Sequence, residues 1–127
     1  MIQVGTILNV IENSGARKVC CIKVLSGYKS RYAFTGDLIM VSVKSLRTRR
    51  KATSKTKKGE IYKALVVKTK HTTKNIFGDT FKFFENSAVL ISKQNKFIGT
   101  RVFGGVPLEF RYSRYLRLIS LSNGVVY

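Results

Sequence analysis

Acidic and metal-binding side chains are scarce in this sequence. The 127 residues contain 6 Asp and Glu, a single His and 2 Cys. A catalytic site needs titratable groups gathered in one cleft, and a structural zinc site needs four Cys or His ligands. The glycines also show neither the phosphate-loop spacing nor the dinucleotide-binding spacing. We therefore expect no enzyme, no metal and no cofactor.

Long apolar runs are also absent, and cysteine is confined to one adjacent pair. No stretch approaches the roughly 20 apolar residues that span a bilayer. Residues 1–16 hold no Lys or Arg, so the sequence predicts neither a signal peptide nor a transit peptide. Cys20 and Cys21 would point to opposite faces of a strand, which makes a disulfide between them unexpected. Reduced cysteines fit an intracellular compartment.

Positive charge dominates the composition, although apolar residues are plentiful. The chain carries 24 Lys and Arg, which gives a formal net charge of +18, and 44% of its residues are hydrophobic. A disordered basic tail would have this charge without the apolar residues that a core needs. The composition predicts a folded core with a cationic surface, and repulsion on that scale indicates a polyanionic partner. We expect that partner to be nucleic acid.

Short apolar segments separated by turn residues run through most of the chain. In residues 37–43 the side chains of Ile39, Val41 and Val43 share one face, which is the period of a half-buried strand. The segments of this kind are 7–11, 19–25, 37–43, 61–70, 81–84 and 88–92. Short strands with turn signals between them predict an antiparallel barrel or sandwich.

The pattern changes over the last thirty residues. Pro107 and Glu109 suit the first turn of a helix, and Ser113 is placed to cap a second short turn over 114–117. We expect one domain over residues 1–127, with the barrel over about 1–96. One or two short helices within 97–127 would then dock on it, so the fold class is all-β with small α additions.

Half of the basic residues fall in one stretch. Between Lys44 and Lys74 lie twelve of the 24 Lys and Arg, with Glu60 as the one acid. Residues 47–58 carry almost no apolar side chain, so we predict a mobile basic loop that becomes ordered against phosphates. Aromatic and basic residues also alternate over 28–34 and 110–117, a mixture suited to stacking on bases or packing on proteins.

Several segments together resemble one family, the universal large-subunit ribosomal protein numbered fourteen in its bacterial and organellar form. The resemblance covers essentially the whole chain in order. It is carried by Met1-Ile2-Gln3, Leu8-Asn9-Val10, Asn13-Ser14-Gly15-Ala16-Arg17, Cys21-Ile22-Lys23-Val24, Arg31-Tyr32-Ala33, Gly36-Asp37, Lys57-Lys58-Gly59-Glu60, Ala64 to Lys70, Ala88-Val89-Leu90, Ile98 to Gly104 and Leu118 to Leu121. Three places depart from the family pattern: a longer basic loop over 47–58, Phe77 before Gly78, and the tail 122–127.

The resemblance implies a five-stranded antiparallel β-barrel with a C-terminal loop and one or two short helices. It implies a structural protein that binds large-subunit rRNA and contributes to bridges with small-subunit rRNA. It also implies packing against the large-subunit proteins numbered three and nineteen. Some members receive the ribosome-silencing factor, on a face whose positions match Thr100, Arg101 and Arg117.

The charge pattern and the resemblance together give a set of residues expected to bind RNA and an expected cellular compartment. The residues expected to bind RNA are Arg17, Lys18, Arg31, Arg49, Arg50, Lys51, Lys57, Lys58, Arg111 and Arg114. Abundant Lys, Asn, Ile, Phe and Tyr suggest an AT-rich gene, so we expect a mitochondrial ribosome, with plastid or bacterial cytoplasm as alternatives. The rival function is a free single-strand-binding barrel of the cold-shock type.

Overall fold

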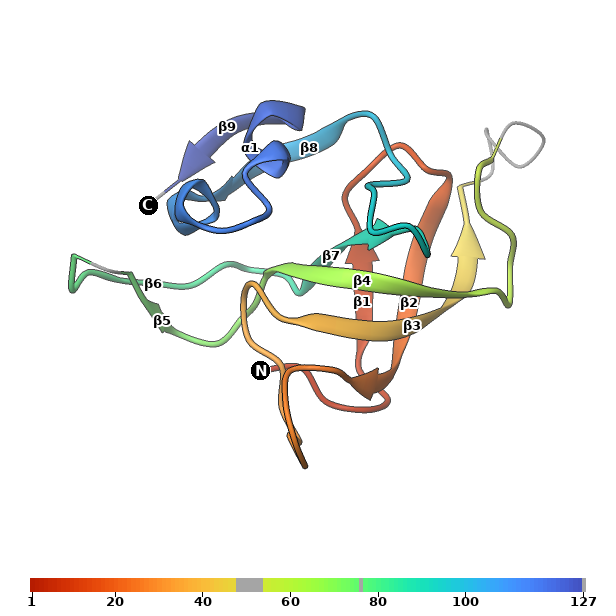
Figure 1. The fold of residues 1–127 in the computed structure, drawn as a ribbon, viewed down its shortest axis with the longest axis horizontal. Coiled ribbons are helices and arrows are strands. Elements are labelled where there is room, and N and C mark those ends of the chain that lie inside the picture. The colour runs from red at the N-terminus through yellow and green to blue at the C-terminus, as the bar shows by residue number, and fades with distance from the viewer. Residues whose placement is uncertain (48–53, 76, 127) are drawn as a thin grey trace.

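Five strands close into a barrel in this computed structural model, which describes residues 1–47, 54–75 and 77–126 (Figure 1). The barrel strands, in the order in which they pair, are β1 (Ile7–Val10), β2 (Ala16–Val24), β3 (Leu38–Leu46), β4 (Ile61–Lys68) and β7 (Ser87–Ile91). The prediction of a five-stranded barrel is confirmed. Its pairings are antiparallel except at the closure, where β1 and β7 run parallel.

The interior of the barrel follows from the period-two pattern of its strands. Ile39, Val41 and Val43 of β3 all point into the core, as their alternation predicts. Cys21 is buried beside them, whereas its neighbour Cys20 is half-buried on the other face, and both thiols are free. The strand period thus decides which of the two cysteines joins the core.

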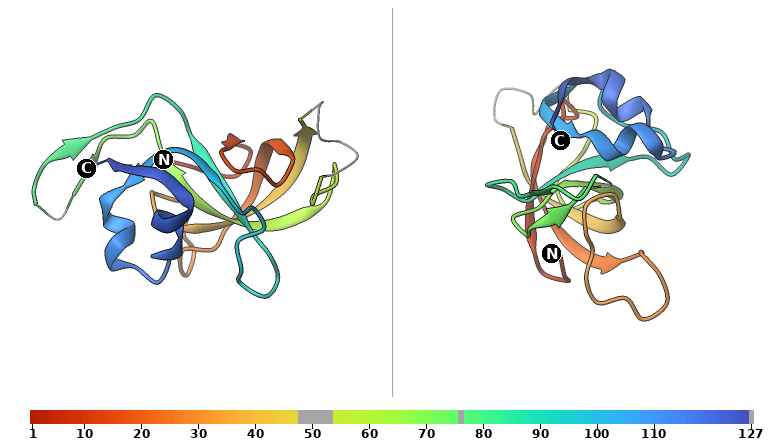
Figure 2. Two further views of the ribbon diagram at one scale, coloured as in Figure 1. Left: turned by 90° about the horizontal axis from the view of Figure 1, so that it is seen from above. Right: turned by 90° about the vertical axis from the view of Figure 1, so that its left-hand side faces the viewer.

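Strands β4 and β7 are buried on both faces. Ala64 and Val66 of β4 face the barrel interior, whereas Leu65 and Val67 belong to a second hydrophobic cluster outside it. That cluster also holds Leu118 and other residues of the C-terminal region, which covers this side of the barrel (Figure 2). A second buried face explains why these two strands are continuous apolar runs instead of alternating ones.

The C-terminal region contains two short helices between two strands. Its elements are β8 (Val102–Pro107), the 3₁₀ helix η2 (Leu108–Tyr112), α1 (Arg117–Leu121) and β9 (Ser122–Val126), with β8 and β9 paired in parallel. Pro107 precedes η2 as expected. Ser113 follows η2 as its C-cap, and its Oγ accepts a hydrogen bond from the Tyr115 N–H at 3.1 Å, so it also caps the turn over residues 114–116 that leads into α1. The sequence did not predict β8 or β9.

The segment expected as a strand over 81–84 does not join the barrel. Only Thr80–Phe81 is extended, as β6, and it pairs with β5 (Thr73–Lys74) in a two-stranded ribbon that projects from the barrel (Figure 1). Phe84 is 95% exposed. The aromatic residues of this segment are typical of a strand, but β7 closes the barrel without it.

Among the described residues no helix is long and apolar enough to cross a membrane.

Candidate nucleic-acid interface

Four of the predicted RNA-binding residues gather at one end of the barrel. Arg17 and Lys18 are exposed at the start of β2, where this strand pairs with the end of β3. Lys57 and Lys58 are exposed in the turn that leads into β4. Backbone hydrogen bonds hold that turn against the same end: Gly59 N–H donates to Val43 O at 2.9 Å. We call these four cations the basic end.

Glu60 and Arg47, which lie near the basic end, both make contacts within the fold. Glu60 accepts a hydrogen bond from the Tyr62 hydroxyl, and burial with this bond raises the pKa of Tyr62 to about 12. Arg47 Nη2 donates to Val10 O at 3.1 Å, and its guanidinium lies 5.7 Å from the centroid of the Phe103 ring. The positive potential of the basic end therefore comes from its exposed cations, with Arg47 acting as an anchor.

The predicted basic loop is held at its described ends. Ser54 Oγ donates to Ser14 O at 3.2 Å, Lys55 N–H donates to Ser14 O at 3.0 Å, and Thr56 is buried. The sequence-based expectation of a mobile loop did not include these contacts. Arg49, Arg50 and Lys51 lie outside the described residues.

A buried carboxylate lies beneath the loop that carries two predicted partner-binding residues. Glu12 is 0% exposed; its Oε1 accepts a hydrogen bond from Leu90 N–H at 3.0 Å and its Oε2 one from Gly99 N–H at 3.2 Å. Burial raises the pKa of Glu12 to about 7, although these hydrogen bonds and the charge of Lys55 act in the opposite direction. In the sequence Glu12 stands directly before the turn residues Asn13-Ser14-Gly15, and no spacing pattern marks it as buried.

Asn13 continues this support along residues 98–101. Its Oδ1 accepts hydrogen bonds from Thr100 N–H at 2.8 Å and from Arg101 N–H at 3.2 Å, and its Nδ2 donates to Thr100 Oγ1 at 2.9 Å. Thr100 and Arg101 are both exposed. The Glu12-Asn13 pair therefore fixes the backbone of this loop and leaves the Arg101 side chain facing solvent.

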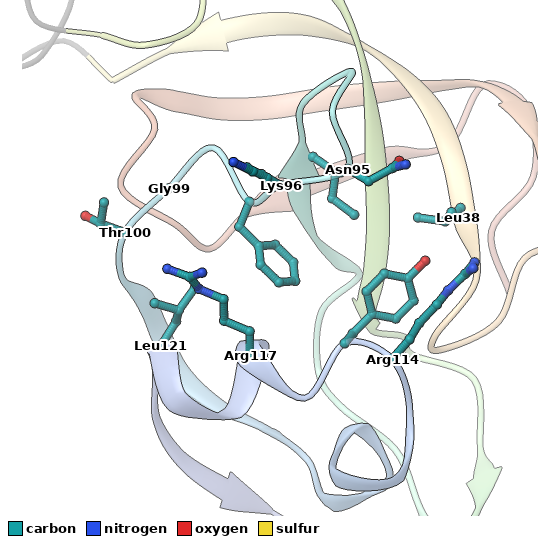
Figure 3. A pocket seen from close by; sticks show the side chains of 11 residues that line it. Leu38, Asn95, Lys96, Gly99, Thr100, Arg114, Arg117 and Leu121 are labelled. Carbon is teal, nitrogen blue, oxygen red and sulfur yellow. The ribbon is translucent and has the colours of Figure 1, made fainter.

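A cavity of about 720 Å³ separates this loop from the C-terminal helices (Figure 3). Lys96, Arg114 and Arg117 supply cations around it, and Thr100 lies on its edge. Its apolar lining is Leu38, Ile91, Phe97, Tyr115 and Leu121, and none of its eleven described lining residues is acidic. Arg101 is not among these residues. The cavity thus unites two of the three predicted partner-binding residues with Arg114, which was assigned to RNA.

Two further predicted residues lie apart from both groups. Arg111 is exposed on η2. Arg31 is exposed in the loop between β2 and β3, whose tip projects away from the C-terminal region (Figure 1). The predicted RNA-binding residues therefore occupy several surfaces, and a large polyanion would have to extend around the barrel to reach them all.

Two further carboxylates have structural partners. Asp37 Oδ2 accepts a hydrogen bond from Phe34 N–H at 2.7 Å, and Glu85 lies 3.9 Å from Lys68 Nζ. In the described part of the chain no three His, Cys, Asp or Glu side chains are grouped closely enough to hold a metal ion. The described surface carries many exposed cationic side chains and several exposed aromatic rings.

The family model described as ribosomal protein L14p/L23e matches residues 1–126, almost the whole chain. The chain belongs to the L14p/L23e family. Membership assigns this L14p/L23e protein a structural role in the large ribosomal subunit, where it associates with rRNA and other ribosomal proteins. The closed barrel and the cationic surfaces around it are consistent with that role.

Proposed function

We propose that this protein binds large-subunit rRNA directly, with the basic end as its principal phosphate-binding surface. The observation that carries the proposal is the grouping of Arg17, Lys18, Lys57 and Lys58, which come from two segments about 40 residues apart, in a member of a ribosomal family. The one acid beside them, Glu60, is engaged by Tyr62. We extend the proposal to Arg31, Arg49, Arg50, Lys51, Arg111 and Arg114, which would bind RNA around the barrel.

We propose that the cavity side of the molecule also receives partners other than large-subunit rRNA. Thr100, Arg101 and Arg117 would contact a protein such as the ribosome-silencing factor, because Asn13 presents two of them from a fixed backbone. We also propose neighbouring contacts with the large-subunit proteins numbered three and nineteen. Bridges to small-subunit rRNA complete the proposed set of contacts.

The RNA-binding proposal is tested by the salt dependence of binding to a large-subunit rRNA transcript. Each lost phosphate contact should lower the slope of log affinity against log salt by about 0.7–0.9. The double variant Lys57→Gln/Lys58→Gln should therefore lower the slope by roughly 1.4–1.8. The control is Lys23→Gln/Lys93→Gln, which removes the same charge from exposed positions outside the basic end. Equal losses from both variants would refute a local site, because net charge alone would then explain binding.

The free single-strand-binding barrel remains the rival function, and family membership favours the ribosomal one. A tagged chain should sediment with the large subunit in a lysate gradient. Recovery mainly in the particle-free fractions would favour the rival.

The compartment is a further proposal. We infer a mitochondrial ribosome from the abundance of Lys, Asn, Ile, Phe and Tyr in the chain. Purification of organellar and cytoplasmic ribosomes from the source cells, followed by peptide mass spectrometry, distinguishes this from plastid or bacterial origin.

A further inference from the structure

Among the exposed aromatic rings of the loop that connects β2 to β3, that of Tyr28 is the most exposed. Tyr28 is 91% exposed and joins neither hydrophobic cluster. The loop projects beyond the barrel on the side away from the C-terminal region (Figure 1). A ring this exposed contributes little to the packing of the fold, and it is accessible to a partner outside the chain.

The base of this loop is closed by side-chain hydrogen bonds. Ser26 Oγ lies 3.0 Å from Ser30 Oγ, and Ser30 Oγ donates to Tyr32 O at 3.2 Å. Lys29 adopts a φ of +53°, which a residue with a side chain adopts at a cost of about 1 kcal/mol or more. The loop therefore holds Tyr28 outward in a defined backbone conformation, and little ordering entropy remains to be lost when the ring is covered.

The charges around the ring suit an anionic partner. Lys29 Nζ lies 5.4 Å from the centroid of the Tyr28 ring, and Arg31 is exposed three residues further along. The nearest acid in the sequence, Asp37, accepts the Phe34 N–H bond within the loop. An exposed ring with two cations in the same loop matches a nucleobase and its neighbouring phosphates, because bases stack on aromatic faces and phosphates bind Lys and Arg.

We propose that Tyr28 stacks on an unpaired base of RNA while Lys29 and Arg31 bind the flanking phosphates. This rests on the proposed RNA-binding function and adds to it the class of ligand at this loop. Bases within an A-form duplex are already stacked, so their faces are closed to Tyr28. The loop should therefore bind single-stranded RNA, such as a loop or bulge, in preference to duplex RNA.

The test compares two probes with the purified full-length chain by fluorescence anisotropy. The probes are fluorescein-labelled U12 and a 12-base-pair RNA duplex. We expect Tyr28→Ala to weaken U12 binding by about 5- to 150-fold, the range that one base–aromatic stack contributes. Duplex binding should change by less than about twofold, because phosphate contacts dominate it. Thermal melts should show unchanged folding, since the ring lies outside the core.

Two further variants separate stacking from apolar contact. Tyr28→Phe keeps the π face and should retain U12 binding, whereas Tyr28→Leu keeps apolar surface without a π face and should behave like the alanine variant. Equal U12 binding by the Leu and Phe variants would overturn the proposal, because apolar contact without stacking would then be sufficient. Equal losses on U12 and duplex, or no loss on either, would also overturn it.

The same assay distinguishes failure of this proposal from failure of RNA binding as a whole. If the unaltered chain bound neither probe at low salt, the proposed function and this inference would both be wrong. If the unaltered chain bound both probes and Tyr28→Ala bound them equally well, only the stacking role would be wrong.

Discussion

Replacement of Glu12 by glutamine should abolish a specific part of the pH dependence of stability. Burial raises the pKa of this carboxyl from 4.5 to about 7 in the folded protein. Between these values the folded protein holds a proton that the unfolded chain has released. Stability must therefore fall as the pH rises through this window.

The magnitude follows from the size of the shift. One pKa unit corresponds to 1.36 kcal/mol, so the whole shift is worth about 3 kcal/mol, of which about 2.5 kcal/mol is lost between pH 5 and pH 8. Glutamine cannot ionise, so Glu12→Gln should remove this component. Its amide oxygen can accept one of the two N–H bonds that Glu12 accepts. The other donor loses its acceptor, at a cost of about 1–3 kcal/mol at every pH.

The assay is urea unfolding of both proteins at pH 5, 6, 7 and 8. Subtracting the two free energies of unfolding at each pH cancels the titration of all other groups. We expect the glutamine variant to be less stable at pH 5 and to approach or exceed the unaltered chain at pH 8. A difference that stays constant across the four pH values would refute the argument, because Glu12 would then titrate alike in the folded and unfolded states.

Two further substitutions test how the C-terminal part of the chain is attached. Gly99→Ala places a Cβ 2.6 Å from Glu12 Oε2, so we expect the free energy of unfolding in urea to fall by about 1–3 kcal/mol. In the control Gly124→Ala the new Cβ meets no atom within 4 Å, so stability should change by less than about 0.5 kcal/mol. Matching losses in the two variants would show that overlap with Glu12 is not the cause. Leu118→Ala truncates a 0% exposed side chain in the cluster beneath α1, which should cost about 2–5 kcal/mol. Its control Leu116→Ala alters a 53% exposed residue and should be near neutral in the same assay; a near-neutral Leu118 variant would contradict the packing described above.

The barrel could be predicted from the sequence because its pattern is local. In β3 the alternation of Ile39, Val41 and Val43 identifies both the strand and its inward face. The segment 81–84 has the same kind of composition, yet it lies next to a ribbon, since strand membership depends on pairing partners that composition does not specify. The glycine-containing strand β8 carries too weak a pattern to be found from residues alone.

The candidate sites were harder to predict from the sequence than the fold was. Exposed cations such as Lys57 and Lys58 follow from composition, but their grouping with Arg17 depends on how the turn before β4 folds back. Glu12 was missed because its burial is created by backbone donors 78 and 87 residues away. A carboxylate beside a turn looks the same in sequence whether it faces water or the N–H groups of a distant loop.

The parallel contact between the first and last barrel strands has a consequence for the order of folding. Asn9 lies opposite Ser87 and Val10 opposite Ala88, so this seam joins positions 78 residues apart in the chain. During synthesis the outer edge of β1 stays without its partner until β7 has left the ribosome that makes it. Long-range pairing of this kind is slow and leaves an unpaired edge open to other chains meanwhile. A nascent chain that does not yet include β7 should therefore be the species most prone to aggregation.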